Sequence, residues 1–137
     1  MDVQEVRKLD AYFKKLFGNA RLRVVPGAKA SESTVFIGEE RLGDLSLDDE
    51  DEDRSYNFRM EISLGQVADI DRLARLDAYL KRKFDNAKIR VMPRPRKQDS
   101  LEAYLGEEFI GVLFVDDEKP RDGEYILEMP ILDMDLG

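Results

Sequence analysis

The chain contains one stretch of sequence twice, and this duplication limits the folds it can adopt more than any other feature. Residues 9–26 read LDAYFKKLFGNARLRVVP, and residues 76–93 read LDAYLKRKFDNAKIRVMP. The repeat divides the chain into residues 1–66 and 67–137, halves of about 68 residues, a length at which a single hydrophobic core is marginal. We therefore expect two copies of one fold that bury surface against each other, related by a pseudo-two-fold axis as in a fused homodimer.

Each half begins with the pattern of an amphipathic helix. In the first half, apolar residues recur at spacings of three and four from Val6 to Leu16, with Asp2 as the expected N-cap and Gly18 as the expected stop. In the second half, Asp69 is the expected N-cap. The apolar residues of this second helix are Ile70, Leu73, Leu76, Leu80 and Phe84.

Four β-prone segments follow each helix. They are residues 21–25, 33–37, 41–47 and 56–62 in the first half, and 88–92, 101–105, 108–115 and 124–132 in the second. The connections, such as Gly38-Glu39-Glu40, are too short for crossovers and predict antiparallel meanders. The expected fold class is α+β, with two tandem α-β-β-β-β units and one helix on one face of each sheet. One continuous sheet and two packed sheets both satisfy the pattern.

The composition argues against most catalytic and metal chemistry. The chain has no Cys and no His, which removes thiolate nucleophiles, thiolate metal sites and the commonest general base near neutral pH. The acidic run at residues 48–53 lacks the Gly and the alternate spacing of a calcium-binding EF-hand loop. Glycine-rich phosphate loops and nucleophile elbows are also missing from the sequence. We therefore assign no catalytic residue, no metal ligand and no cofactor, and expect a non-enzymatic protein.

The chain also lacks the sequence signs of a membrane protein. Its apolar runs fall short of the roughly 18 residues that span a bilayer. The N-terminus is acidic, where a signal peptide would be basic and then apolar. We expect a cytoplasmic protein without a membrane partner.

Several motifs of the second half carry a family resemblance. They are LDAY at residues 76–79, RVMPRPRK at 90–97, LGEEFIG at 105–111 and ILDMDL at 131–136. In these motifs the chain resembles a family of short alphaproteobacterial proteins of unknown function, which are usually a single unit of this size. The resemblance covers nearly all of the second half and, more loosely, the first, where GAKA at residues 27–30 replaces the basic proline-rich loop. It implies a bacterial cytoplasm and no activity, so no functional residue is carried over.

The two halves differ on the sheet face that points away from the helix. The third and fourth strands of the first half present the polar residues Asp44, Ser46 and Asn57 there. The matching residues of the second half are Val112, Phe114 and Ile126, which Ile110 and Leu132 are expected to join. A strand that is apolar on both faces is covered on both sides. The cover is either the first half, paired within the chain, or a partner, which is a second copy in a homodimer or another protein.

A second difference is the positive charge of the second half. Four residues near its first strand form a candidate phosphate or nucleic-acid contact: Arg90, Arg94, Arg96 and Lys97. The alternative is that they balance neighbouring acidic loops, which we favour because a net charge of −8 repels a polyanion beyond the patch itself. The leading hypothesis is thus a protein-interaction or regulatory module, and the alternative is a nucleic-acid-binding protein.

Overall fold

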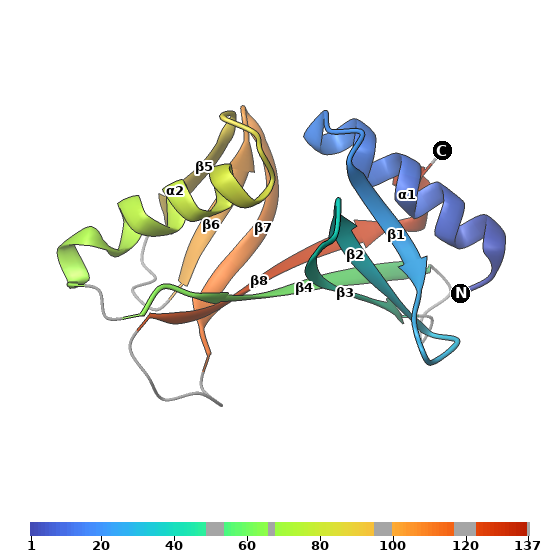
Figure 1. Ribbon diagram of the computed structural model, residues 1–137. Coiled ribbons are helices and arrows are strands. Elements are labelled where there is room, and N and C mark those ends of the chain that lie inside the picture. The colour runs from blue at the N-terminus through green and yellow to red at the C-terminus, as the bar shows by residue number, and fades with distance from the viewer. Residues whose placement is uncertain (49–53, 66–67, 95–99, 117–122, 137) are drawn as a thin grey trace. The chain divides into compact units, whose positions relative to one another are not determined.

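The computed structural model describes residues 1–48, 54–65, 68–94, 100–116 and 123–136, and contains two α-helices and eight strands (Figure 1). The first repeat supplies α1 (Val3–Phe17), β1 (Leu22–Pro26), β2 (Glu32–Ile37), β3 (Glu40–Asp48) and β4 (Ser55–Ser63). The second supplies α2 (Arg72–Lys83), β5 (Ile89–Pro93), β6 (Ser100–Leu105), β7 (Glu108–Val115) and β8 (Glu124–Leu132). Residues 49–53 of the acidic run lie outside the described residues. The α+β class is confirmed.

Helix α1 begins and ends where the sequence predicts. The Asp2 carboxylate accepts a hydrogen bond from the Glu5 amide at 2.8 Å, and the Glu5 carboxylate accepts one from the Asp2 amide at 3.2 Å. This reciprocal capping box satisfies two amides that have no partner within the helix. Gly18 ends the helix in the left-handed conformation, with φ of 59°.

Helix α2 differs from its prediction at the N-terminus. Residues Asp69–Asp71 form a 3₁₀ turn, and the residue at the N-cap is Asp71, whose side chain makes no capping hydrogen bond. The assignment of Asp69 as N-cap was therefore wrong. Ile70 is 90% exposed, whereas Leu76 and Leu80 are buried. A 3₁₀ turn has three residues per turn instead of 3.6, so Ile70 falls off the apolar stripe of the helix that follows.

A repeated aspartate joins each helix to the first strand of its repeat. Asp10 of α1 accepts a hydrogen bond from the backbone amide of Val24 in β1 at 2.9 Å. Asp77 of α2 accepts the same bond from Val91 in β5, also at 2.9 Å. Each aspartate forms an ion pair with the lysine one turn later. These bonds give a structural reason for the aspartate in the repeated LDAY motif.

The strands form one antiparallel sheet with the order β1-β2-β3-β4-β8-β7-β6-β5. Both repeats contain a bulge in their third strand, where Leu42 and Ile110 are extra residues without a partner in the register. A glycine, Gly43 or Gly111, follows each bulge. A β-carbon on Gly111 would lie 2.5 Å from the carbonyl oxygen of Glu128, so the neighbouring backbone leaves no room for a side chain. The repeated glycine is a packing requirement of the sheet.

The compact units of the structure do not coincide with the repeats of the sequence. Unit 1 comprises Met1–Arg59 and Pro130–Gly137, and unit 2 comprises Met60–Met129. Strand β4 therefore starts in unit 1 and ends in unit 2, and β8 starts in unit 2 and ends in unit 1. Repeat limits at 66/67 describe the duplication, whereas each folded unit includes the end of a strand from the other repeat.

Hydrogen bonds within each unit attach the exchanged strand ends. In unit 1 the Asp133 amide donates to the Arg54 carbonyl at 3.1 Å. In unit 2 the Leu64 amide donates to the Gly123 carbonyl at 2.8 Å. Ile131, at the end of β8, is completely buried, as is Ile62 at the end of β4. The end of each last strand thus contributes a buried residue to the unit of the other repeat.

The core of each unit lies between its helix and one face of its strands. In unit 1 the ring of Phe13 contacts the ring of Phe58 edge-on, with 5.3 Å between ring centres. In unit 2 the buried side chains of the helix are Leu76 and Leu80, and Phe84 is buried just after it. Within the described part of the chain, neither helix is long and apolar enough to cross a membrane.

Candidate functional site

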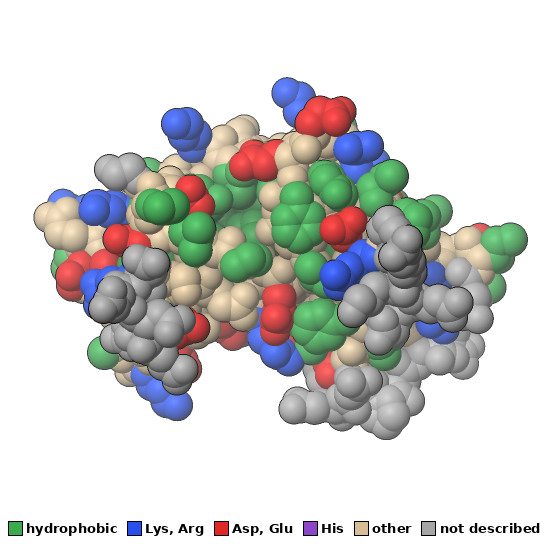
Figure 2. Space-filling model, turned by 180° about the vertical axis from the view of Figure 1, so that it is seen from behind, with side chains coloured by type: hydrophobic (Ala, Val, Ile, Leu, Met, Phe, Trp, Pro, Cys, Tyr) green, Lys and Arg blue, Asp and Glu red, His purple; other side chains and the backbone are tan. Residues whose placement is uncertain are grey.

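The β6, β7 and β8 strands of unit 2 present two rows of residues on the sheet face opposite α2. One row is Glu102, Val112 and Glu128, and the next is Ser100, Phe114 and Ile126. Val112 and Phe114 are half-buried. Figure 2 shows the molecule from the side opposite to that of Figure 1, and on this side hydrophobic side chains gather among charged ones.

The bulge in β7 brings a different residue to this face than strict alternation predicts. Because Ile110 is the extra residue, Phe109 is the partner of Tyr104 across the strand pair. The two rings meet edge-on, with centres 5.8 Å apart and planes at 76°. Phe109 is 46% exposed, whereas Ile110 is only 7% exposed. We call Tyr104, Phe109, Val112 and Phe114 the outer patch of unit 2.

The five apolar residues proposed from the sequence are therefore placed differently from one another. Ile110 is buried at the bulge and does not lie on the outer face. Val112 and Phe114 lie in the outer patch. Ile126 pairs with Phe114 but is only 2% exposed, so it supports the patch and offers almost no surface itself. Leu132 is 46% exposed and belongs to unit 1, not to unit 2.

The sequence analysis did not place Phe109 on this face. An alternating pattern places every second residue of a strand on the same face, so an unrecognised bulge shifts all positions before it. The Gly that follows the bulge in both repeats is the signal that could have located it.

The same face of unit 1 is mostly polar, although Phe36 lies on it opposite Arg41. Asp44 of β3 lies between Thr34 and Arg59, and its carboxylate forms an ion pair with Arg41. The next row is Glu32, Ser46 and Asn57. Opposite charges therefore lie side by side on this face. This agrees with the polar, solvated outer face that the sequence predicts for the first repeat.

Arg90 has a structural role next to the outer patch. Its Nε and Nη2 atoms donate hydrogen bonds to the Gly106 carbonyl at 3.0 and 2.7 Å, and its guanidinium lies 5.5 Å from the centre of the Tyr104 ring. In unit 1, Arg23 donates to the Gly38 carbonyl at 3.0 Å and lies over an aromatic ring in the same way. Both repeats use this arrangement. In each, the arginine of the first strand holds the turn between the second and third strands in place.

The described part of the structure does not show the other predicted phosphate contacts close together. Arg94 donates a hydrogen bond to the Ser100 hydroxyl at 3.2 Å. Arg96 and Lys97 lie outside the described residues. Among the residues that the structure describes, no three acidic side chains are close enough to hold a metal ion.

The pKa of Tyr56, in unit 1, is clearly perturbed. The Tyr56 hydroxyl donates a hydrogen bond to the Glu5 carboxylate at 2.6 Å, and Arg54 lies 3.4 Å from the same carboxylate oxygen. Burial, followed by the hydrogen bond and the negative charge of Glu5, raises the pKa of Tyr56 well above its ordinary value. The phenol therefore stays protonated and acts as a donor.

A helix followed by four antiparallel strands, present twice in one chain, defines a tandem-repeat α+β protein. Residues 5–64 and residues 72–135 each match the family described as "Protein of unknown function (DUF3126)", so the chain belongs to this family and contains its unit twice. No curated protein and no solved structure matches the chain. The tandem duplication predicted from the sequence is confirmed, and the family assigns no activity to it.

Proposed function

We propose that this protein is a non-enzymatic interaction or regulatory module, and that the outer patch of unit 2 is its contact surface. The observation that carries the proposal is the exposed Phe109 ring, packed edge-on against Tyr104 beside two half-buried apolar side chains. Aromatic residues that combine exposure with a fixed orientation are typical anchors of protein interfaces. At the position of Phe109, the wet face of unit 1 has Arg41.

The charges beside the patch indicate the chemistry of the partner. Val112 lies between Glu102 and Glu128 across the sheet, and this row contains no basic residue. The basic residue beside the next part of the patch, Arg90, is engaged by the Gly106 carbonyl. The whole chain has a net charge of −8. Two identical chains would therefore repel each other over long distances, whereas a basic surface would be attracted. We commit to a partner protein that presents apolar side chains flanked by Lys or Arg, in preference to a second copy.

The proposal extends to the absence of catalysis and to location. The lack of His and Cys in the sequence supports a non-enzymatic role, because it removes the side chains most often used as base and nucleophile at neutral pH. A bacterial cytoplasm is the location we propose, supported by the resemblance to short alphaproteobacterial proteins.

A peptide-display selection on the full chain tests the proposal. We expect the wild type to select peptides with aromatic or aliphatic residues flanked by Lys and Arg. Phe109→Asp should weaken their binding at least about tenfold, which corresponds to one interface anchor. Arg41→Asp places the same acid at the equivalent position of unit 1 and should leave binding unchanged.

Two further measurements keep the outcome decisive. Glu102→Lys reverses a charge beside Val112 without removing any apolar side chain of the outer patch, and it should weaken the same peptides even if Phe109→Asp does not fold, as judged by circular dichroism. Light scattering of the wild type over a range of concentrations tests whether two copies of the chain form a dimer. Acidic peptides, equal loss in Arg41→Asp, or a dimer that Phe109→Asp abolishes would each overturn the proposal of a basic partner.

The nucleic-acid alternative is not favoured by the described contacts. Arg90 is engaged by a carbonyl and an aromatic ring, and Arg94 by a serine hydroxyl. Affinity for mixed RNA and DNA that falls steeply with added salt would restore this alternative.

A further inference from the structure

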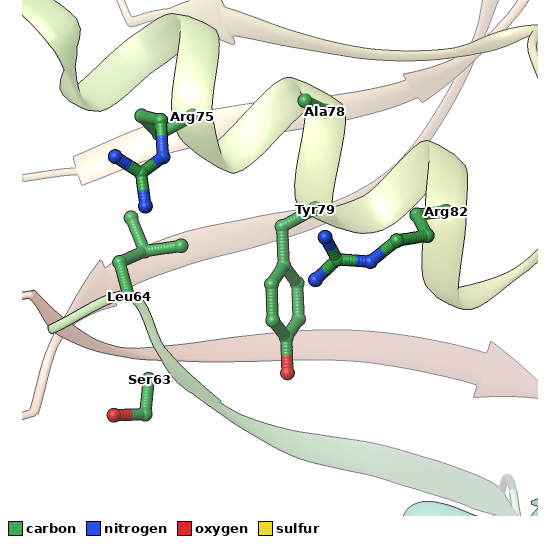
Figure 3. Close-up of a pocket in the computed structure, with 6 residues that line it drawn as sticks. All are labelled: Ser63, Leu64, Arg75, Ala78, Tyr79 and Arg82. Carbon is green, nitrogen blue, oxygen red and sulfur yellow. The ribbon is translucent and has the colours of Figure 1, made fainter.

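Unit 2 contains a polar hollow that is separate from its outer patch. The hollow lies between α2 and the end of β4 and has a volume of about 120 Å³. Its lining residues are Ser63, Leu64, Arg75, Ala78, Tyr79 and Arg82 (Figure 3). All six belong to unit 2, although Ser63 and Leu64 come from the first repeat.

The lining carries two positive charges and no negative one. Arg75 and Arg82 are two helical turns apart and so share one face of α2, with the small Ala78 between them. In Figure 3 the guanidinium of Arg82 extends toward Tyr79, whose centre lies 5.5 Å away, and the side chain of Arg75 extends toward Leu64. Arg75 makes no ion pair with any other residue in the described part of the chain. Both arginines are exposed and can therefore turn toward a bound group.

Hydroxyl groups complete the lining. The Tyr79 hydroxyl points toward β4 (Figure 3). The Ser63 hydroxyl donates a hydrogen bond to the Glu124 carboxylate at 2.8 Å. Beyond the lining, Arg72 of the same helix donates to the Tyr125 hydroxyl at 3.2 Å and adds a further positive charge to this side of α2. The hollow therefore offers two guanidinium groups and the Tyr79 hydroxyl in one place.

The equivalent place in unit 1 contains negative charges that the hollow of unit 2 lacks. The Asp133 amide bonds to Arg54 as the Leu64 amide bonds to Gly123, so Asp133 occupies the position of Leu64. Glu5 likewise occupies the position of Arg72, and its carboxylate accepts the hydrogen bond from Tyr56. The negative charges of Glu5 and Asp133 both act to raise the pKa of Tyr56. The helix keeps positive residues at the positions of the two arginines, but they are Lys8 and Lys15, which lack the flat two-pronged donor of arginine.

From these contrasts we infer that the hollow of unit 2 binds the phosphate group of a small anion through Arg75 and Arg82. A guanidinium donates two parallel hydrogen bonds to a phosphate, and two guanidiniums on one helix face match its several oxygens. The volume corresponds to about four water molecules at about 30 Å³ each, the size of a compact oxyanion. The net charge of −8 opposes long polyanions and favours a single phosphate group.

Titration of the full chain with inorganic phosphate, followed by the side-chain NMR signals of arginine and the ring signals of tyrosine, tests this inference. We expect saturable shifts at Arg75, Arg82 and Tyr79 that persist at constant ionic strength with chloride. The double variant Arg75→Gln, Arg82→Gln should weaken binding at least about tenfold, since it removes the charge-assisted hydrogen bonds. The matched control Lys8→Gln, Lys15→Gln removes the same charge from unit 1 and should change the affinity less than about twofold.

The source of the phosphate is tested by competition. If phosphoserine displaces inorganic phosphate at the same arginine signals, the site recognises a phosphate monoester; if it does not, the site takes the free ion. Absence of saturable shifts, loss of them in chloride, or equal loss in both double variants would overturn the inference. Phe109→Asp should leave phosphate binding intact, so failure here and failure of the proposed interaction surface can be distinguished.

Discussion

The exchange of strand ends predicts that a core mutation in the last strand of one repeat destabilises the unit that contains the helix of the other repeat. Ile131 is encoded in the second repeat but lies fully buried in unit 1, and Ile62 is encoded in the first repeat but lies fully buried in unit 2. Ile131→Ala should therefore loosen α1 and its strands, and Ile62→Ala should loosen α2 and its strands. The two variants serve as reciprocal controls, because the same atoms are removed from equivalent positions.

The expected size follows from burial. Ile→Ala removes three buried carbon atoms, worth about 2.4 kcal/mol at about 0.8 kcal/mol each, and the cavity that remains brings the total into the range of about 2–5 kcal/mol. A local loss of about 3 kcal/mol corresponds to roughly 100-fold faster amide exchange where exchange reports the local opening equilibrium.

Native-state hydrogen exchange measures the local loss of stability at each backbone amide. After Ile131→Ala, the amides of α1 should exchange about 100-fold faster than in the wild type, while those of α2 change less than about threefold. After Ile62→Ala the pattern should reverse. Faster exchange in α2 after Ile131→Ala, or equal acceleration in both helices, would refute the assignment of the strand ends to the opposite units.

Two other predictions concern single hydrogen bonds. Asp77→Ala leaves the amide of Val91 without its acceptor and should lower the free energy of unfolding by about 1–3 kcal/mol in urea melts, whereas Asp77→Asn keeps an acceptor oxygen and should recover part of the loss. Tyr56 has a folded-state pKa above its unfolded value of 10.0, so the stability from its protonated hydroxyl is complete below that pH and declines above it. The difference in unfolding free energy between wild type and Tyr56→Phe should therefore shrink by about 1.4 kcal/mol between about pH 8 and pH 11, and a constant difference would contradict the raised pKa of Tyr56 in the folded protein.

Much of the local structure could be predicted from the sequence. The helical spacing of apolar residues, the capping Asp2 and the terminal Gly18 locate α1 because these signals act within one turn of chain. The short connections correctly predicted antiparallel strands. The chemical contrast between Asp44 and Val112 was visible as well, since the repeat aligns the two positions directly.

The candidate site was only partly predictable. Val112 and Phe114 lie on the outer face as expected, but the bulge buries Ile110 and brings Phe109 to the surface beside Tyr104. The role of Asp77 as a bond to the strand was equally hidden, because its partner lies 14 residues away along the chain. A pattern of alternation carries no information about such partners.

By itself, the sequence determined that one α-β-β-β-β unit is present twice, and that the second copy has a more apolar outer face. These are properties of residue order and periodicity, which act over short distances along the chain. Only the tertiary structure decided where β4 and β8 leave one unit for the other, which arginines line a common hollow, and which residue each bulge buries. Those outcomes depend on pairings between residues far apart in sequence, where packing and backbone hydrogen bonds select among registers that the pattern alone leaves equal.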